Sequence, residues 1–109
     1  NDLDKEFLQK AVDYIVNNLQ DSQLSVDSIA ALYNLSRMQV YRKIKALTGK
    51  SVVEFIKMVR MKQAISLMDA NKLTLAEIAY EVGFNSASYF TRCFKEEYGK
   101  TPSEYLERR

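Results

Sequence analysis

A sequence stretch that occurs twice in the chain predicts most of its architecture. The first copy reads Leu24-Ser25-Val26-Asp27-Ser28-Ile29-Ala30, and the second, 49 positions later, reads Leu73-Thr74-Leu75-Ala76-Glu77-Ile78-Ala79. The match continues through Tyr33/Val82, Asn34/Gly83 and Leu35/Phe84, and the extra residue Asn85 then moves the offset to 50. The later pairs are Ser36/Ser86, Val40/Phe90, Arg42/Arg92, Ile44/Phe94, Lys45/Lys95, Gly49/Gly99 and Lys50/Lys100. The chain therefore contains an internal repeat.

Each copy has the pattern of a short helix, a tight turn and a second helix. Asn34 and Gly83 occupy the turn position, and Asn and Gly are the residue types that best tolerate a positive φ angle. Two short helices joined by such a turn form a helix-turn-helix unit. The alternative is a solenoid of αα-hairpins. A solenoid uses several copies at one fixed period, whereas this chain has two copies around a different central segment.

Helix start and stop signals divide the chain into short helices. In a capping box, a Ser or Thr and a Glu or Gln three positions later satisfy the first free N–H groups of a helix. Four segments fit this pattern: Ser36–Gln39, Ser51–Glu54, Thr74–Glu77 and Thr101–Glu104. Asp2 or Asp4 is the expected N-cap of the first helix. Gly49, Gly83 and Gly99 each follow an apolar-periodic stretch, which they can close in a left-handed conformation.

These signals predict an all-α fold of seven helices with no strand. The helices are expected at 4–19, 26–33, 37–48, 52–70, 75–82, 86–98 and 102–107. The helix 52–70 is apolar nearly all round, so we expect it to be buried on more than one side and to hold the two copies together. The residues 1–109 then form a single domain with a first helix-turn-helix subdomain (1–50), a linker helix (51–70) and a second subdomain (71–109).

The composition excludes several classes of function. With no His and one Cys among 109 residues, the chain lacks imidazole acid–base groups, His metal sites and an internal disulfide. Its three Gly and one Pro are all used at helix ends, which leaves no Gly-rich phosphate loop. We therefore expect no enzyme, no cofactor, no metal and no small-molecule pocket in this segment. The lone Cys93 is interpreted as a small core residue rather than a redox switch.

The second helix of each copy carries similar residues on its outward face. At about 100° per residue, one side of each helix is apolar and must face the core, through Val40, Ile44, Leu47, Phe90 and Phe94. Opposite them lie Met38, Arg42 and Lys45 flanked by Arg37 and Tyr41, and Ser88, Arg92 and Lys95 flanked by Ala87 and Thr91. A solvated helix face also carries Lys and Arg. The same arrangement in both copies instead favours two recognition helices that enter DNA major grooves.

Charge is separated along the chain, although the net charge is only +2. Residues 36–63 hold eight Lys or Arg and one acid, a balance of +7, whereas residues 1–24 hold two Lys and five acids, a balance of −3. This polarity is typical of a phosphate-binding surface with a solvated back.

Two longer patterns carry a family resemblance. The second copy contains Ile78-Ala79-x-x-Val82-Gly83-Phe84-x-Ser86-x-x-Tyr89-Phe90-x-Arg92-x-Phe94-Lys95-x-x-x-Gly99-x-Thr101-Pro102-x-x-Tyr105, and the central helix contains Arg60-x-x-x-Ala64-x-x-Leu67-Met68. With these patterns the chain resembles the DNA-binding domain of the AraC family of transcription regulators over nearly its whole length. The first copy departs from the family at Tyr33, where a small residue is usual, and at Asn34, Gln39 and Ile44.

The resemblance implies sequence-specific binding of double-stranded DNA that regulates transcription, with each second helix in one of two adjacent major-groove segments. By position, the base-reading candidates are Arg37, Met38, Tyr41, Arg42, Ser86, Ala87, Ser88, Thr91 and Arg92. The expected phosphate-binding residues are Ser36, Lys43, Lys45, Lys50, Arg60, Lys95 and Lys100.

A second resemblance concerns the wider protein. Segments 4–8 and 36–49 look like the output domains of hybrid two-component sensors, in which a membrane-bound sensor, a kinase and a receiver precede this domain. Since the first residue is not Met, we expect a segment of a longer chain. The resemblance implies that the missing part holds sensor or effector domains. We expect a cytoplasmic location, on the cytoplasmic side of the membrane in a hybrid sensor. RNA polymerase is a further candidate partner.

One alternative function comes from another class. A helical protein-interaction module, docking on a polymerase subunit or a partner regulator, would share the all-α fold. Such a module would not select one duplex from a random pool, so DNA selection discriminates between the two hypotheses.

Overall fold

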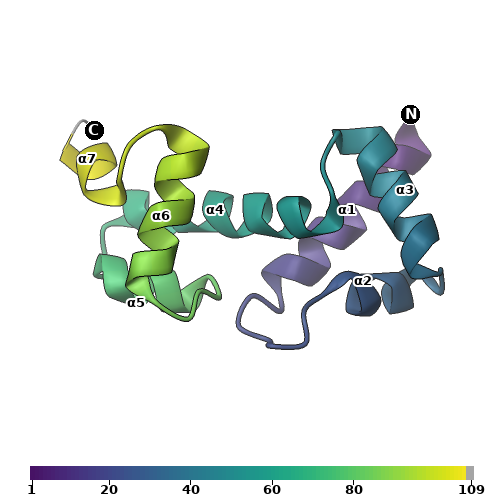
Figure 1. The fold of residues 1–109 in the computed structure, drawn as a ribbon, viewed down its shortest axis with the longest axis horizontal. Coiled ribbons are helices and arrows are strands. Elements are labelled where there is room, and N and C mark those ends of the chain that lie inside the picture. Colours follow the sequence, from purple (N-terminus) through teal and green to yellow (C-terminus); the bar gives the residue numbers. More distant parts are fainter. Residues whose placement is uncertain (108–109) are drawn as a thin grey trace. The chain divides into compact units, whose positions relative to one another are not determined.

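The computed structural model describes residues 1–107, which form helices and connecting turns with no strand. The seven helices within this range are α1 (Asp2–Val16), α2 (Val26–Tyr33), α3 (Arg37–Thr48), α4 (Val52–Ala70), α5 (Leu75–Glu81), α6 (Ala87–Tyr98) and α7 (Pro102–Glu107). Figure 1 shows their order along the chain. The predicted all-α fold with seven helices is confirmed. No helix among the described residues is long and apolar enough to cross a membrane.

The chain folds as two compact units, Asn1–Arg60 and Met61–Arg109, with a border inside α4. The last two residues of the predicted second subdomain, 108 and 109, lie outside the described part of the chain. α4 supplies buried side chains to both units: Val52, Phe55, Ile56 and Val59 before the border, and Met61, Ala64 and Met68 after it. This one helix therefore belongs to two cores.

The core of the first unit is mostly aliphatic. Helices α1, α2, α3 and the start of α4 bury Ala11, Ile15, Ile29, Ala30, Val40, Ile44, Val52, Phe55, Ile56 and Val59. α2 packs directly against α3. Burying one Ile or Val side chain stabilises a fold by about 1.5–3 kcal/mol relative to leaving it exposed. The apolar spacing read from the sequence thus fixes which faces of these helices meet.

Tyr33, at a position where the resemblance to the AraC family implies a small residue, joins α2 to α1. Its ring stacks on Phe7 with the ring centroids 4.2 Å apart, and its hydroxyl donates a hydrogen bond to the Phe7 carbonyl. The ammonium of Lys10 lies 5.3 Å from the Tyr33 ring centroid. Burial raises the pKa of Tyr33 to about 12. The departure from the family pattern is therefore accommodated by packing against α1.

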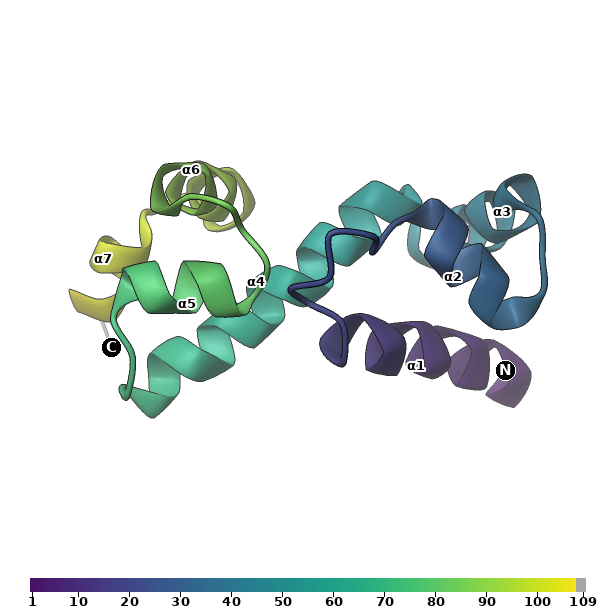
Figure 2. The ribbon, with the colours of Figure 1, turned by 90° about the horizontal axis from the view of Figure 1, so that it is seen from below.

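The core of the second unit is aromatic. Phe94 is fully buried, and its ring centroid lies 5.9 Å from Phe90, 4.7 Å from Tyr98 and 5.9 Å from Tyr105. Phe84 extends the cluster at 5.4 Å from Phe90. Figures 1 and 2 show α5 running beside the last turns of α4. The predicted core residues Val40, Ile44, Phe90 and Phe94 are all buried, whereas Leu47 is half-buried.

The two predicted turns close in the same way. Asn34 has a φ angle of 56° and Gly83 one of 98°, so both lie in the left-handed region, as their residue types predict. In the first turn the N–H of Leu35 donates to the Ala30 carbonyl at 3.0 Å. The equivalent bond in the second turn joins Phe84 and Ala79 at 2.9 Å. Each bond joins an N–H to the carbonyl five positions earlier, as in the Schellman motif at a helix C-terminus. It satisfies a helix carbonyl that would otherwise lack a partner.

All four predicted capping boxes are present. In each, the Ser or Thr hydroxyl accepts from the N–H three residues later, and the Glu or Gln oxygen accepts from the N–H of the capping residue. The N–H of Ser51 lowers the pKa of the Glu54 carboxyl, and the N–H of Thr74 does the same for Glu77. A fifth box, formed by Ser25 and Ser28, was not predicted. Ser28 stands where the usual capping box has Glu or Gln, but its hydroxyl accepts from the Ser25 N–H in the same way, at 2.9 Å.

The predicted bounds of the first helix are wrong at both ends. α1 begins at Asp2 because Asn1, rather than Asp2 or Asp4, is the N-cap, accepting from the N–H of Asp4 at 2.9 Å. It ends at Val16 instead of residue 19, because the side-chain amide of Asn18 donates to the Tyr14 carbonyl at 2.8 Å. Asn side chains compete in this way for backbone groups and favour helix ends. The other predicted helix bounds are within one residue of the observed ones.

Candidate nucleic-acid interface

The two proposed recognition helices, α3 and α6, begin in the same way. Ser36 and Ser86 are their N-caps, and each hydroxyl accepts from an N–H three residues later at 3.1 Å. Among the helices of residues 1–107, only α3 and α6 have no acidic residue in the first turn. Acids stabilise a helix N-terminus but repel phosphate. Their absence here leaves the two helix N-termini compatible with the DNA backbone.

The structure exposes most of the residues predicted to read bases. In α3, Arg37, Met38, Tyr41 and Arg42 are exposed, and Met38 and Tyr41 keep 55% and 43% of their surface in solvent. Met38 and Tyr41 stay exposed while Val40 and Ile44 of the same helix are fully buried, so α3 has an outward face that does not pack in the core.

α6 presents a smaller and more polar outward face. Ser86, Ala87, Ser88 and Arg92 are exposed, and Thr91 is half-buried. The Arg92 guanidinium lies 5.6 Å from the Tyr89 ring centroid, within the range of a cation–π contact. Tyr89 also contacts Phe84 at 5.6 Å between ring centroids, so the ring that supports Arg92 is fixed to the core. Tyr89 is a contact of Arg92 that was not predicted from the sequence, although its spacing of three residues from Arg92 is a signal.

Three of the predicted DNA-contacting cations of α3 have partners within the protein. Arg37 pairs with Asp27 of α2, with 3.1 Å between Nε and Oδ1. Lys43 lies 3.5 Å from Oδ1 of Asp4 and 5.2 Å from the Phe7 ring centroid, so it is drawn toward α1. Lys45 donates one hydrogen bond to the Gly49 carbonyl at 3.1 Å, which closes the end of α3. An ammonium has three donors, so Lys45 keeps two.

The remaining predicted phosphate contacts differ in exposure. Lys95 is exposed on α6, whereas Lys50 and Lys100 are half-buried after the equivalent glycines Gly49 and Gly99. Both glycines have φ angles near 75°, at 75° and 76°. The repeat therefore places a Lys directly after the recognition helix in each unit.

Arg60 has a structural partner at the position where the sequence predicts a phosphate contact. Its terminal amino group donates to the Leu19 carbonyl at 2.9 Å and so ties α4 to the loop that follows α1. The side chain is half-buried. This contact competes with binding to phosphate, so Arg60 is not part of the proposed interface.

Replacing Arg60 tests its structural role. Arg60→Met keeps an apolar stem but removes the charged donor, and we expect a loss of about 1.5–3 kcal/mol in the free energy of unfolding. Urea denaturation measures this loss. Lys62→Met, an exposed change on the same helix, is expected to stay within about 0.5 kcal/mol of the wild type. If Arg60→Met left stability intact and lowered the salt dependence of DNA binding instead, Arg60 would be a phosphate contact.

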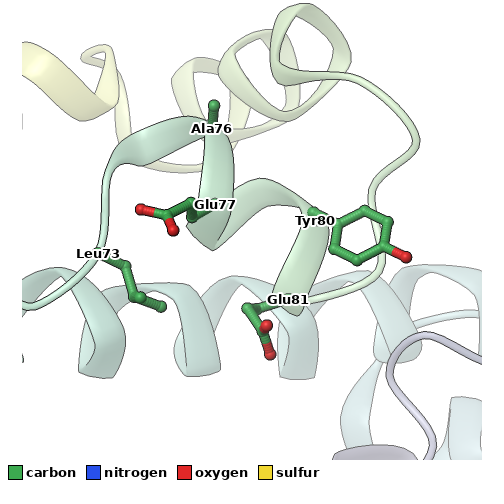
Figure 3. A pocket seen from close by; sticks show the side chains of 5 residues that line it. All are labelled: Leu73, Ala76, Glu77, Tyr80 and Glu81. Carbon is green, nitrogen blue, oxygen red and sulfur yellow. The ribbon is translucent and has the colours of Figure 1, made fainter.

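The remaining candidate sites are the lone cysteine, possible metal-binding clusters and a surface hollow. Cys93 is buried within the aromatic core, consistent with its interpretation as a small core residue. No group of three or more His, Cys, Asp or Glu side chains that could hold a metal ion is found among residues 1–107. An open hollow of about 390 Å³ lies along α5 (Figure 3). It is lined by Leu73, Ala76, Glu77, Tyr80 and Glu81. It is a surface depression, not an enclosed cavity.

The fold and the repeated outward faces define a helix-turn-helix protein, and comparison with known proteins agrees. The sequence matches the helix-turn-helix domain family over residues 29–108 and belongs to that family. The chain is an AraC-type DNA-binding domain with two such units. A solved transcriptional regulator from Chromobacterium violaceum, described as containing an AraC-type DNA-binding domain, superposes with a TM-score of 0.87 at 25% identity, over 99% of this chain and 96% of that one.

Two curated relatives are much longer than this chain. Histidine kinase P4 of Formosa agariphila is 36% identical over 97% of this chain, which spans 8% of that protein. The Msm operon regulatory protein of Streptococcus mutans is 38% identical over 84% of this chain, which spans 33% of it. The chain therefore corresponds to one part of these relatives.

Proposed function

We propose that this domain binds one specific double-stranded DNA site through α3 and α6, each in one of two adjacent major-groove segments, and so regulates transcription. The observation that carries the proposal is the repeated outward face. In both units a Ser-capped helix without a first-turn acid presents an exposed Arg, at positions 42 and 92, and an exposed Lys, at positions 45 and 95. An exposed helix face of this size and charge fits the major groove.

The proposed base-reading residues divide into three chemical kinds. Arg37, Arg42 and Arg92 can donate two parallel hydrogen bonds to guanine. Ser88 and Thr91 can bond several base edges, and the apolar parts of Met38, Tyr41, Ala87 and Thr91 can contact thymine methyl groups. Ser86 occupies the N-cap position that Ser36 has in the first unit, and we assign the same phosphate-side role to both. The proposed phosphate contacts of Lys43, Lys45, Lys50, Lys95 and Lys100 fix the register without reading sequence.

Substitution of the two equivalent arginines tests base reading. Arg42→Ala and Arg92→Ala are each expected to relax specificity at one position of the site and to cost about 1–3 kcal/mol of binding free energy there. Competition binding with a panel of single-base site variants measures this effect. Arg→Lys at the same positions keeps the charge but not the paired donors, so specificity should still fall. If either Ala variant loses affinity equally on all sequences, that Arg contacts phosphate.

The proposal for the rest of the protein rests on the length of its relatives. Since the chain spans 8% of a histidine kinase relative, we propose that it is the output domain of a longer protein, such as a hybrid two-component sensor working by phosphorelay. RNA polymerase and the other domains of that protein are the proposed partners, and the cytoplasm is the proposed location. We propose no catalytic role for this domain.

Selection from a random duplex library tests the proposed function directly. Recovery of one site with two separately conserved segments, each about half a helical turn wide, would support reading by two helices. If the domain enriched no sequence but bound a polymerase subunit, the function would be that of a protein-interaction module.

A further inference from the structure

The ion pair between Arg37 and Asp27 bridges the two helices of the first helix-turn-helix. Asp27 is in the first turn of α2, and Arg37 is the first residue of α3. Nε of Arg37 lies 3.1 Å from Oδ1 of Asp27. Contact at Nε leaves the two terminal amino groups at the tip of the guanidinium, which are the groups that donate in parallel to O6 and N7 of guanine.

The ion pair itself adds little to stability, although Asp27 is favourably placed in the first turn of α2. The side chains are 72% and 68% exposed, and an ion pair so exposed contributes little to folding. A cation at the first position of a helix is also unfavourable for the helix dipole. Arg37 is therefore badly placed for stabilising α3 but well placed for reaching out from its N-terminus. An exposed Arg has many rotamers, and a partner that restricts them lowers the entropy lost on binding.

The second unit provides an internal comparison. The repeat aligns Asp27 with Ala76 and Arg37 with Ala87, so both members of the pair are replaced together. Ala76 and Ala87 are exposed and occupy the same places in α5 and α6. The acid and the base are present together in one unit and absent together in the other. If Asp27 served only to stabilise α2, its presence would not depend on which residue occupies position 37.

We infer that Asp27 is a specificity-determining positioning residue, which orients Arg37 toward a guanine in the half-site read by the first unit. The inference rests on the proposed DNA-binding function. The second half-site has no equivalent guanine requirement, because Ala87 offers only a methyl group there. Asp27 itself contacts no base. The inference requires that its carboxylate stays with the guanidinium in the complex and keeps away from the phosphates, which it would repel.

The test combines selection from a random duplex library with binding to single-base site variants. The position read by Arg37 is defined as the one whose preference disappears in Arg37→Ala. Asp27→Ala, which introduces the residue found at position 76, is expected to reduce the guanine preference at that position by about fivefold or more. Preferences at all other positions should stay unchanged. Asp27→Glu, which keeps the carboxylate, should restore part of the preference.

Two further measurements separate positioning from charge and from folding. Affinity for non-specific DNA should stay unchanged in Asp27→Ala, since on this inference the carboxylate interacts with Arg37 rather than with the phosphates. In the Arg37→Ala background, Asp27→Ala should change no base preference. Equal strengthening on all duplexes, or equal weakening at all positions, would overturn the inference. So would an unchanged guanine preference in Asp27→Ala. A wild-type domain that enriches no site would instead remove the proposed function, and this inference with it.

Discussion

Specific DNA binding by this domain is expected to weaken by roughly 500-fold when the salt concentration rises from about 50 to 200 mM. Each phosphate neutralised by a cation releases condensed counterions, and the logarithm of affinity falls with a slope of about −0.9 per contact. Five lysines of the proposed interface, at positions 43, 45, 50, 95 and 100, give a slope near −4.5. Fluorescence anisotropy of a labelled duplex over a salt series measures it.

Single lysine variants assign this slope to named residues. Lys95 is exposed on α6, and Lys95→Gln is expected to lower the slope by about 0.9 without changing base preference. Lys5→Gln removes the same charge from α1, outside the proposed interface, and should leave the slope unchanged. A slope shallower than about −1 for the wild-type domain would contradict DNA as the partner. Equal effects of the two variants would indicate that net charge, rather than position, governs binding.

Phe94→Ala is expected to destabilise the second unit by about 3–5 kcal/mol, because it leaves a cavity in a fully buried aromatic cluster. Hydrogen exchange and chemical denaturation should place the loss in residues 61–107, with the first unit retaining its protection. On the proposed function, the protected region of a bound duplex should shrink to one half-site.

Two control variants locate the effect in the core. Phe94→Leu keeps an apolar side chain of intermediate size and should cost less than Phe94→Ala. Glu96→Ala changes an exposed residue of the same helix and should stay within about 0.5 kcal/mol of the wild type. A Phe94→Ala domain within about 1 kcal/mol of the wild type would contradict the packing described for α6.

The helices could be predicted from the sequence because the signals that start and end them are local. Ser36 and Gln39, or Thr74 and Glu77, satisfy each other within one turn, and a Gly or Asn that must adopt positive φ marks the turn by its residue type. The prediction failed where two local choices compete. Asn1 and Asp2 are equally good caps in sequence, and only the position of the Asp4 N–H decides between them.

The chemistry of the candidate site was less predictable, because its contacts join residues that are distant in sequence. Arg60 and Lys43 look like ordinary basic residues in the sequence. Only the packing of α1 shows that Arg60 binds the Leu19 carbonyl, 41 residues away, and that Lys43 faces Asp4. The pairing of Asp27 with Arg37 likewise depends on how α2 meets α3. Which residues lie on the outward faces was predictable from helical periodicity, and their roles on DNA remain predictions.

Because the outward faces of the two units differ, the proposed function also gives the bound domain a defined orientation on DNA. α3 presents Arg37, Met38 and Tyr41 where α6 presents Ala87, Ser88 and Thr91. On the proposed function, two such faces read a site without two-fold symmetry, so a single bound domain distinguishes upstream from downstream. A palindromic operator bound by a symmetric dimer has no such polarity. Inverting the site beside a promoter would then turn the bound protein around and present a different surface to whatever initiates transcription there.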